Sequence, residues 1–245
     1  MRYWRSKEHD LEFVLSENSE IAFEKHNHNS NYVVGLVLQG NVQLEAVDSY
    51  MCTSGDMFII PKDEVHVVRL LNSDTKLLSM CIKINYLTQH DLKTGEVLLN
   101  EVLTLLIQDE IVMKQHADAL CDAFHMVYEM YTTREKEQGD EIWKVKNLMI
   151  TQPELPWNLD ELSKEIFISK YYMIRMFKDR TGLTPHCFHI QNRIRKAQQL
   201  LQQGWKVIDV AAEMGFYDQS HFVKAFRKIV GISPNEYQES IHWLK

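Results

Sequence analysis

Hydrophobic and polar residues alternate over about the first 85 positions of the chain, a pattern that is typical of β-strands. An apolar run at 32–38 meets an alternating run at 42–46 across Gln39-Gly40-Asn41, which predicts a β-hairpin with a glycine turn. Three more short strands are expected, at residues 57–60, 65–71 and 78–84. Many short strands with polar turns favour a sandwich, a jelly roll or a small barrel.

The spacing of the apolar residues becomes helical from about residue 96. Two amphipathic helices are expected, at 97–108 and 116–136, which either cover the barrel or pair across a dimer. The polar run 132–140 is a predicted linker, and the residues beyond it have helical spacing. The pattern therefore predicts an α+β chain in three parts: a β-barrel or jelly roll at 1–90, a helical segment at 91–138 and an all-α domain at 139–245.

The all-α part repeats itself at an offset of 49 residues. Phe177-Lys-Asp-Arg-Thr-Gly-Leu-Thr-Pro185 aligns with Phe226-Arg-Lys-Ile-Val-Gly-Ile-Ser-Pro234, so that aromatic, glycine and proline positions coincide. The same offset pairs Leu159 and Asp160 with Ile208 and Asp209, Leu162 with Ala211, Ser169 with Asp218, Arg175 with Lys224 and Phe188 with Tyr237. Such a repeat marks one structural unit that is used twice.

Each repeat predicts a helix, a short turn and a second helix, which is a helix-turn-helix unit. The first helices are expected at 159–166 and 207–214, and a long helix at 185–203 joins the two units. Ser169 and Asp218 precede the second helices, where their side chains can accept a backbone N–H of the first turn.

The second helix of such a unit can present its N-terminal residues to base edges in a major groove of DNA. The predicted DNA-binding positions are Lys170, Tyr171, Tyr172, Ile174, Arg175 and Lys178 in the first unit, and Gln219, Ser220, His221, Val223, Lys224 and Arg227 in the second. Arginine and lysine can pair with guanine or phosphate, and glutamine with adenine. A cationic helix face can also be merely solvated, but two matched copies favour DNA binding.

The net charge of the whole chain is −7, which by itself argues against a nucleic-acid partner. The charges are, however, distributed unevenly along the sequence. Residues 1–138 hold 12 basic and 22 acidic residues, whereas residues 169–228 hold 11 basic and 4 acidic residues. The acidic excess therefore belongs to the N-terminal half, and the two predicted recognition helices lie in a segment of charge +7.

The composition excludes several other classes of protein. With 45% hydrophobic and 25% charged residues, the chain is typical of a globular protein rather than a disordered one. The longest apolar run is far shorter than the ~20 residues of a membrane span, and the N-terminus lacks the apolar core of a secretory signal. Four cysteines without a CxxC pair indicate reduced thiols. These features predict a cytoplasmic protein with no membrane partner.

The all-α part resembles the AraC/XylS family of transcription regulators over about residues 141–242, most specifically at 211–237, which begins Ala-Ala-Glu-Met-Gly-Phe-Tyr-Asp. The resemblance implies that the two units read adjacent major grooves on one face of promoter DNA. The implied base-facing residues are Tyr171, Ile174, Arg175, Gln219, Ser220, Val223 and Lys224. Ile174 departs from the polar residue often present at its position, and contact with a thymine methyl group is its physical substitute.

The N-terminal half resembles the cupin sensor domain of the same family through His26-Asn-His28 and through the spacing of Gly55, Pro61 and His66. The resemblance implies a barrel that holds a small-molecule effector, with one of the following helices pairing in a homodimer. Residues 1–90 are then the sensor barrel, 91–138 the dimerisation segment and 139–245 the DNA-binding domain. RNA polymerase is a further candidate partner.

Three histidines of the barrel are candidate ligands. His26 and His28 are two apart on a predicted strand and so point to the same face, and His66 lies on a later strand. Three converging imidazoles could bind Zn, Ni, Fe or Mn, hydrogen-bond an organic ligand directly, or serve only the structure. Metal-binding cupins usually add a glutamate where this chain has Tyr32. The predicted ligand-binding residues are His26, His28, Tyr32 and His66, and a divalent transition metal at the three histidines is one alternative.

Motifs of enzymes are missing from the sequence, because it contains no GxSxG, no HExxH and no glycine-rich phosphate loop. We therefore predict no catalytic site and a ligand-responsive transcription regulator. The alternatives are a metal-dependent cupin enzyme fused to a DNA-binding module, and a regulator controlled by a partner protein instead of a small molecule.

Overall fold

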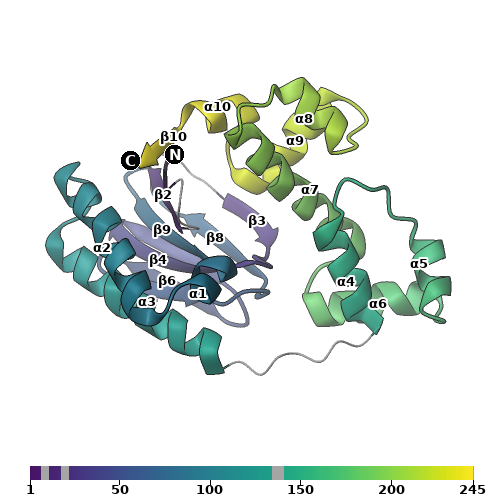
Figure 1. The fold of residues 1–245 in the computed structure, drawn as a ribbon, viewed down its shortest axis with the longest axis horizontal. Coiled ribbons are helices and arrows are strands. Elements are labelled where there is room, and N and C mark those ends of the chain that lie inside the picture. The colour runs from purple at the N-terminus through teal and green to yellow at the C-terminus, as the bar shows by residue number, and fades with distance from the viewer. Residues whose placement is uncertain (7–10, 18–21, 134–140, 245) are drawn as a thin grey trace. The chain divides into compact units, whose positions relative to one another are not determined.

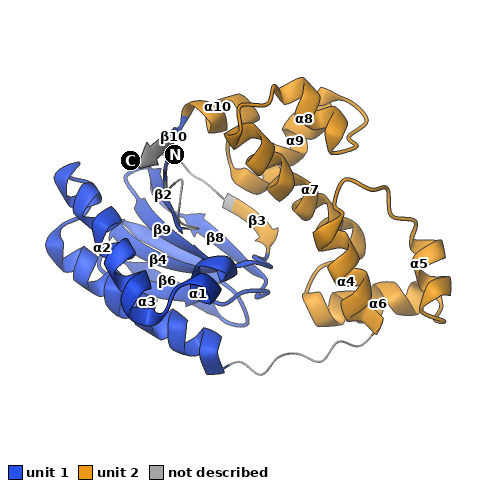
Figure 2. Cartoon of the chain, in the orientation of Figure 1, with its two compact units in different colours: residues 1–22, 27–135, 240–245 blue, residues 23–26, 136–239 orange. Residues whose placement is uncertain are grey.

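A computed structural model of the chain describes residues 1–6, 11–17, 22–133 and 141–244. It divides into two compact units, one of residues 1–22, 27–135 and 240–245, the other of residues 23–26 and 136–239 (Figures 1 and 2). Most of the predicted linker at 132–140, and with it the predicted boundary after residue 138, lies outside the described residues. Among those that are described, no helix combines the length and the apolarity that crossing a membrane requires.

Two β-sheets form the framework of the first unit, and of their strands only β3 is grouped with the second unit, through its residues 23–26. The strands are β1 (Arg2–Ser6), β2 (Leu11–Glu17), β3 (Ala22–His26), β4 (Asn31–Gln39), β5 (Asn41–Glu45), β6 (Ser49–Thr53), β7 (Met57–Ile60), β8 (His66–Leu70), β9 (Lys76–Lys83) and β10 (Ile241–Leu244). The larger sheet has the order β10-β1-β2-β9-β4-β7 and the smaller one β3-β8-β5-β6. β1 and β10 pair in parallel, whereas β4 pairs antiparallel with β7 and β9.

The predicted hairpin around Gly40 is wrong, because the strands on its two sides belong to different sheets. A tight hairpin needs a loop of at least two residues, and only Gly40 separates β4 from β5. Gly40 has a φ of 78°, and a Cβ there would lie 2.5 Å from the side-chain oxygen of Thr75. The glycine thus allows a sharp, closely packed corner at which the chain passes from one sheet to the other.

Three helices cover one face of the larger sheet: α1 (Ile84–Gln89), α2 (Leu92–Gln108) and α3 (Lys114–Thr133) (Figure 1). Asp91 caps α2, since its side chain accepts the backbone N–H of Thr94 at 2.7 Å. The core between sheet and helices includes the fully buried side chains of Phe13, Leu36, Leu99 and Phe124. The two amphipathic helices expected at 97–108 and 116–136 are therefore present as α2 and α3 and pack on the sheet, except that residues 134–136 lie outside the described residues.

Among the described residues of the second unit, the regular structure apart from β3 is helical. Its helices are α4 (Glu141–Thr151), α5 (Leu159–Glu165), α6 (Lys170–Thr181), α7 (Pro185–Gln202), α8 (Val207–Glu213), α9 (Gln219–Val230) and α10 (Pro234–Glu239). α5 and α6 form the first predicted helix-turn-helix unit, and α8 and α9 the second. The long helix α7 runs between them (Figure 2).

The predicted caps of the second helices are confirmed. The Ser169 side chain accepts the N–H of Tyr172 at 3.3 Å, and the Asp218 side chain accepts the N–H of His221 at 2.7 Å. Both helices end at glycines in the left-handed conformation, Gly182 and Gly231, which an L side chain would occupy only with strain.

The repeat extends to the packing of the two cores. Phe177 of α6 lies edge-on to Phe188 of α7, with ring centroids 5.3 Å apart. The residues 49 positions later, Phe226 and Tyr237, meet in the same way at 5.5 Å. Sequence repetition therefore corresponds to repetition of an aromatic contact between each second helix and the helix that follows it.

The first helices of the two units are offset by 48 residues, so the pairing predicted upstream of the turns is wrong by one residue. Leu162 corresponds to Val210 and Ile166 to Met214, and all four are buried. The second turn contains one more residue than the first, because three positions separate the end of α5 from Ser169 and four separate the end of α8 from Asp218. Tyr217, in the longer turn, is 95% exposed.

Candidate DNA-binding and effector sites

The face that α6 presents to solvent contains the residues predicted to bind DNA. Met173 and Phe177 are buried and hold the helix in its unit, whereas Tyr171, at 86% exposure, Tyr172, Arg175 and Lys178 are exposed. Ile174 and Lys170 are partly exposed. The helix therefore separates an apolar inner side from an outer side that carries aromatic and cationic groups.

Two cations of the first unit already contact carboxylates. The Lys170 ammonium lies 2.8 Å from the Asp160 carboxylate of α5, and the Arg175 guanidinium lies 3.8 Å from Asp179 one turn later on α6. Exposed ion pairs of this kind are weak, so the Arg175 side chain can exchange its partner for a base or a phosphate at little cost. Lys170 is held closer and also supports the contact between α5 and α6.

The exposed face of α9 is similar in charge but different in chemistry. Gln219, Ser220, His221, Lys224 and Arg227 are exposed and Val223 is partly exposed, while Phe222 and Phe226 are buried. The His221 ring packs edge-on against Phe216 with centroids 5.4 Å apart, which restricts its orientation. At the positions of the two tyrosines and the isoleucine of α6, α9 therefore has a serine, a histidine and a valine.

The three predicted histidines lie close together, but the predicted strand over both His26 and His28 is wrong, because β3 ends at His26 and His28 follows it. One ligand atom from each of His26, His28 and His66 lies within 4.8 Å of the others. The His28 and His66 rings stack with centroids 5.1 Å apart and planes inclined by 22°. Nδ1 of His66 lies 2.9 Å from the Glu64 carbonyl oxygen, so that Nδ1 is the N–H donor of this hydrogen bond and the ring orientation is fixed.

The fit of these histidines to a metal is partial. A backbone carbonyl that accepts the N–H of a ring nitrogen is the usual support of a metal-binding imidazole. Bond lengths of about 2.0–2.1 Å to zinc require ligand nitrogens roughly 3.4 Å apart, so the imidazoles would have to move closer together. The three histidines are also not joined by the glutamate of metal-binding cupins, because this chain has Tyr32 at that position.

Tyr32 does not lie beside these imidazoles. It is fully buried in the core between the larger sheet and helices α1–α3. Its hydroxyl finds no hydrogen-bond partner among the residues that the structure describes. The structure therefore brings together the three predicted histidines but places Tyr32 in the core under the helices.

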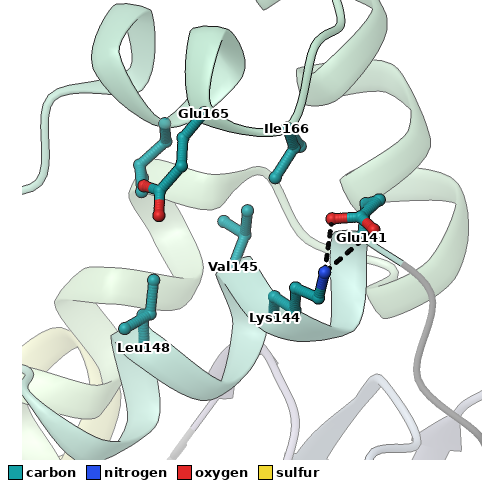
Figure 3. A pocket seen from close by; sticks show the side chains of 7 residues that line it. Glu141, Lys144, Val145, Leu148, Glu165 and Ile166 are labelled. Carbon is teal, nitrogen blue, oxygen red and sulfur yellow. Dashed lines mark hydrogen bonds and ion pairs between the residues drawn. The ribbon is translucent and has the colours of Figure 1, made fainter.

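A groove that was not predicted lies between α4 and α5 in the second unit (Figure 3). Val145, Leu148, Leu162 and Ile166 form its apolar lining, and Glu165 lies at its edge. The Lys144 ammonium at the rim is 2.9 Å from the Glu141 carboxylate. None of the residues predicted to bind DNA or effector lines this groove.

Sequence reasoning also missed two buried polar side chains of α7, His189 and Arg193. The His189 Nε2 lies 2.8 Å from the carbonyl oxygen of Pro153, and the Arg193 Nε donates to the same oxygen at 3.0 Å. Burial lowers the pKa of His189, and the neighbouring positive charge of Arg193 acts in the same direction. Polar residues within the buried stripe of an amphipathic helix were the signal that could have revealed them.

Both halves of the chain match known families. Residues 9–79 match the AraC-like ligand binding domain, and residues 162–240 match a helix-turn-helix domain. The HTH-type transcriptional regulator MtrA of Neisseria gonorrhoeae is 35% identical over 43% of this chain, and the match spans only 34% of MtrA. The uncharacterized HTH-type transcriptional regulator YbfI of Bacillus subtilis is 27% identical over 81% of each chain.

The fold of the whole chain also has a solved counterpart. ToxT from Vibrio cholerae O395 superposes with a TM-score of 0.62 at 16% identity, covering 94% of this chain and 98% of that one. Domain order, the two family matches and the paired helix-turn-helix units agree, and they point to a non-enzymatic family. The chain belongs to the AraC family of transcriptional regulators, with an AraC-like ligand-binding domain followed by a helix-turn-helix DNA-binding domain.

Proposed function

We propose that a small-molecule effector bound by the N-terminal unit controls how the two helix-turn-helix units of this chain read promoter DNA. The observation that carries the proposal is the matched pair of capped helices, α6 and α9, whose inner sides are buried and whose outer sides carry cations and hydrogen-bonding groups. An effector that prefers one state of the protein would shift the population toward that state and so change DNA occupancy.

The two recognition helices are proposed to read DNA by different chemistry. On α6, Tyr171 and Ile174 offer apolar contact to thymine methyl groups, and Arg175 offers a bidentate donor to guanine. On α9, Gln219 can pair with adenine and Lys224 with guanine or phosphate. One chain would thus recognise two different half-sites in adjacent major grooves.

Replacing Arg175 or Lys224 with alanine is expected to weaken binding of the full chain to its selected DNA site by about 1–3 kcal/mol each. Each side chain is exposed near the N-terminal half of its helix, where it can reach base edges. The site is first selected from random duplexes with the wild-type chain, and affinities are then measured by fluorescence anisotropy at one fixed salt concentration.

The control for both variants is Lys93→Ala, which removes the same charge from an exposed position of α2 in the other unit. Its affinity should stay at the wild-type value. If Arg175→Ala and Lys224→Ala also bind like the wild type, α6 and α9 are not the recognition helices.

We further propose that the stacked pair His28 and His66 contacts the effector. Their rings lie 5.1 Å apart, and the hydrogen bond of Nδ1 to the Glu64 carbonyl oxygen orients the buried His66 ring. Direct hydrogen bonding to an organic molecule requires no movement of the rings, whereas a metal requires the nitrogens to approach. Direct contact is therefore the proposal, and a bound divalent transition metal is its alternative.

Effector binding should raise the melting temperature of the full chain, because a ligand that binds only the folded state stabilises it. The probe is a panel of small carboxylic acids, sugars and aromatic amines, each tested with and without EDTA. His66→Gln, which keeps a donor for the Glu64 carbonyl, is expected to weaken binding of the active compound by about 1–3 kcal/mol. His186→Gln, at an exposed position of α7, is the control.

A thermal shift that EDTA removes and Zn²⁺ restores would contradict direct contact and favour the metal. An active compound with equal effect on wild type and His66→Gln would place the effector elsewhere.

We also propose that the chain forms a homodimer through exposed side chains of α2 and α3, such as Val97 and Met126. A contact with RNA polymerase is a further proposal.

A further inference from the structure

Arg193 occupies an unusual place for a cation, in the middle of the long helix α7 with only 9% of its surface exposed. Its donors reach four backbone carbonyl oxygens. The partners are Pro153 at 3.0 Å, Gly215 at 3.1 Å, Leu155 at 3.4 Å and Glu154 at 3.5 Å. The guanidinium carbon also lies 5.9 Å from the centre of the Phe216 ring, within cation–π range.

These partners come from both helix-turn-helix units. Residues 153–155 lie in the segment between α4 and α5 and lead into the first unit, whereas Gly215 and Phe216 lie in the turn between α8 and α9 of the second unit. One side chain therefore joins the entrance of the first unit to the turn of the second. His189, one helical turn earlier, adds a second contact to the Pro153 carbonyl oxygen.

The chemistry of the contact is specific to arginine. A guanidinium has five donors in a planar fork, so it can bond to carbonyl oxygens on two sides at once, whereas a lysine ammonium is a compact point charge on a flexible stem. The backbones come close together here, since a Cβ on Gly215 would lie 3.2 Å from Nη2 of Arg193 and 3.3 Å from the Glu154 carbonyl oxygen. The position therefore favours a rigid joint over a loose apolar contact.

We propose that Arg193 is a positioning residue that fixes α9 relative to α6 and so determines the spacing of the two half-sites that one chain can read. The inference rests on the proposed function. One base pair inserted between half-sites moves them apart by about 3.4 Å and rotates them by roughly 35°. A rigid joint cannot follow that change, whereas a loosened joint can.

The test measures how the affinity of the full chain depends on half-site spacing. Arg175→Ala and Lys224→Ala first assign the two halves of the selected site, and duplexes are then made with one or two base pairs inserted or deleted between them. The wild type is expected to lose about tenfold or more per step, within the usual cost of a disrupted contact. Arg193→Lys is expected to bind more weakly at the best spacing and to discriminate less than about threefold between neighbouring spacings. Arg195→Lys, the same exchange on the same helix, should keep the wild-type profile.

The possible outcomes separate the two ideas. A wild-type chain that selects no DNA sequence overturns the proposed function and this inference together. A wild type with a steep spacing profile that Arg193→Lys retains, or shifts by an equal factor at every spacing, overturns only the inference, because a merely structural residue would act uniformly. If Arg193→Lys does not fold, His189→Gln, which alters one contact of the same joint, is measured instead, and an unchanged profile again overturns the inference.

Discussion

Raising the salt concentration from 50 to 200 mM is expected to weaken DNA binding by the full chain by about 10³–10⁵-fold, the range for proteins that contact 6–10 phosphates. The two proposed recognition helices supply seven cations, a number within that range: Lys170, Arg175, Lys178, Arg180, Lys224, Arg227 and Lys228. Each phosphate contact releases condensed counterions, so the logarithm of the affinity falls linearly with the logarithm of salt concentration. Anisotropy titrations at four salt concentrations measure the slope.

The magnitude of the slope tests which cations take part. Lys178→Ala and Arg227→Ala should each reduce it by about one, since both lysine and arginine contact phosphate as charges. Lys93→Ala in the N-terminal unit should leave it unchanged. A nearly flat salt response would contradict DNA binding through these helices. In that case the acidic N-terminal half, and not the basic helices, would indicate which partners the chain binds.

Replacing Phe226 with alanine is expected to lower the free energy of unfolding of the C-terminal unit by about 3–5 kcal/mol. The side chain is fully buried in the second helix-turn-helix unit, and its ring lies edge-on to Phe222 at 5.6 Å and to Tyr237 at 5.5 Å. Alanine removes both aromatic contacts and leaves a cavity that the short helices around it can only partly fill. Urea denaturation followed by circular dichroism measures the loss.

Two further variants provide comparisons for Phe226→Ala. Phe177→Ala removes the equivalent ring of the first unit, 49 residues earlier, and should cost a similar amount. Tyr217→Ala removes an aromatic ring that is 95% exposed and should change stability by less than about 0.5 kcal/mol. An equal response of Phe226→Ala and Tyr217→Ala would mean that the packing described for the second unit is wrong.

The features that could be predicted from the sequence are local ones. Ser169 and Asp218 cap helices because a short side-chain oxygen meets an unpaired N–H three residues later, and that geometry depends on adjacent residues alone. The buried inner sides of α6 and α9 follow from helical spacing. The proximity of His28 and His66 required one more step, the assumption of a common barrel, and the resemblance to a known family supplied it.

The features that could not be predicted depend on contacts between distant segments. Gly40 indicates a turn, but nothing near it in the sequence tells whether the next strand stays in the same sheet. Tyr32 points to the helix side of its sheet. The register in which β4 pairs with β7 and β9 determines which face of the sheet each side chain of β4 occupies. Arg193 lies in a basic segment and resembles a surface residue until the four carbonyl oxygens around it are known.

Phe167 shows how the two repeats have diverged in their turns. It has a φ of 56° and is 94% exposed, whereas the equivalent position of the second unit is Gly215, with a φ of 66°. A bulky residue in the left-handed region costs about 1–2 kcal/mol relative to glycine. The first turn thus tolerates strain that the second avoids, and the second instead accommodates the close approach of the Arg193 guanidinium.

The extra residue of the second turn has a consequence for recombining the two repeats. One residue rotates a position on an α-helix by about 100°. A segment exchanged at a constant period of 49 across the turn would therefore bring Ile208, which is exposed, into the environment of Leu159 and misplace the buried stripe of α5. Exchange of the 12-residue helices 170–181 and 219–230 alone avoids this, because caps and C-terminal glycines stay in register. If α6 and α9 read DNA as proposed, such a chimera is expected to read its two half-sites in reversed order along the DNA.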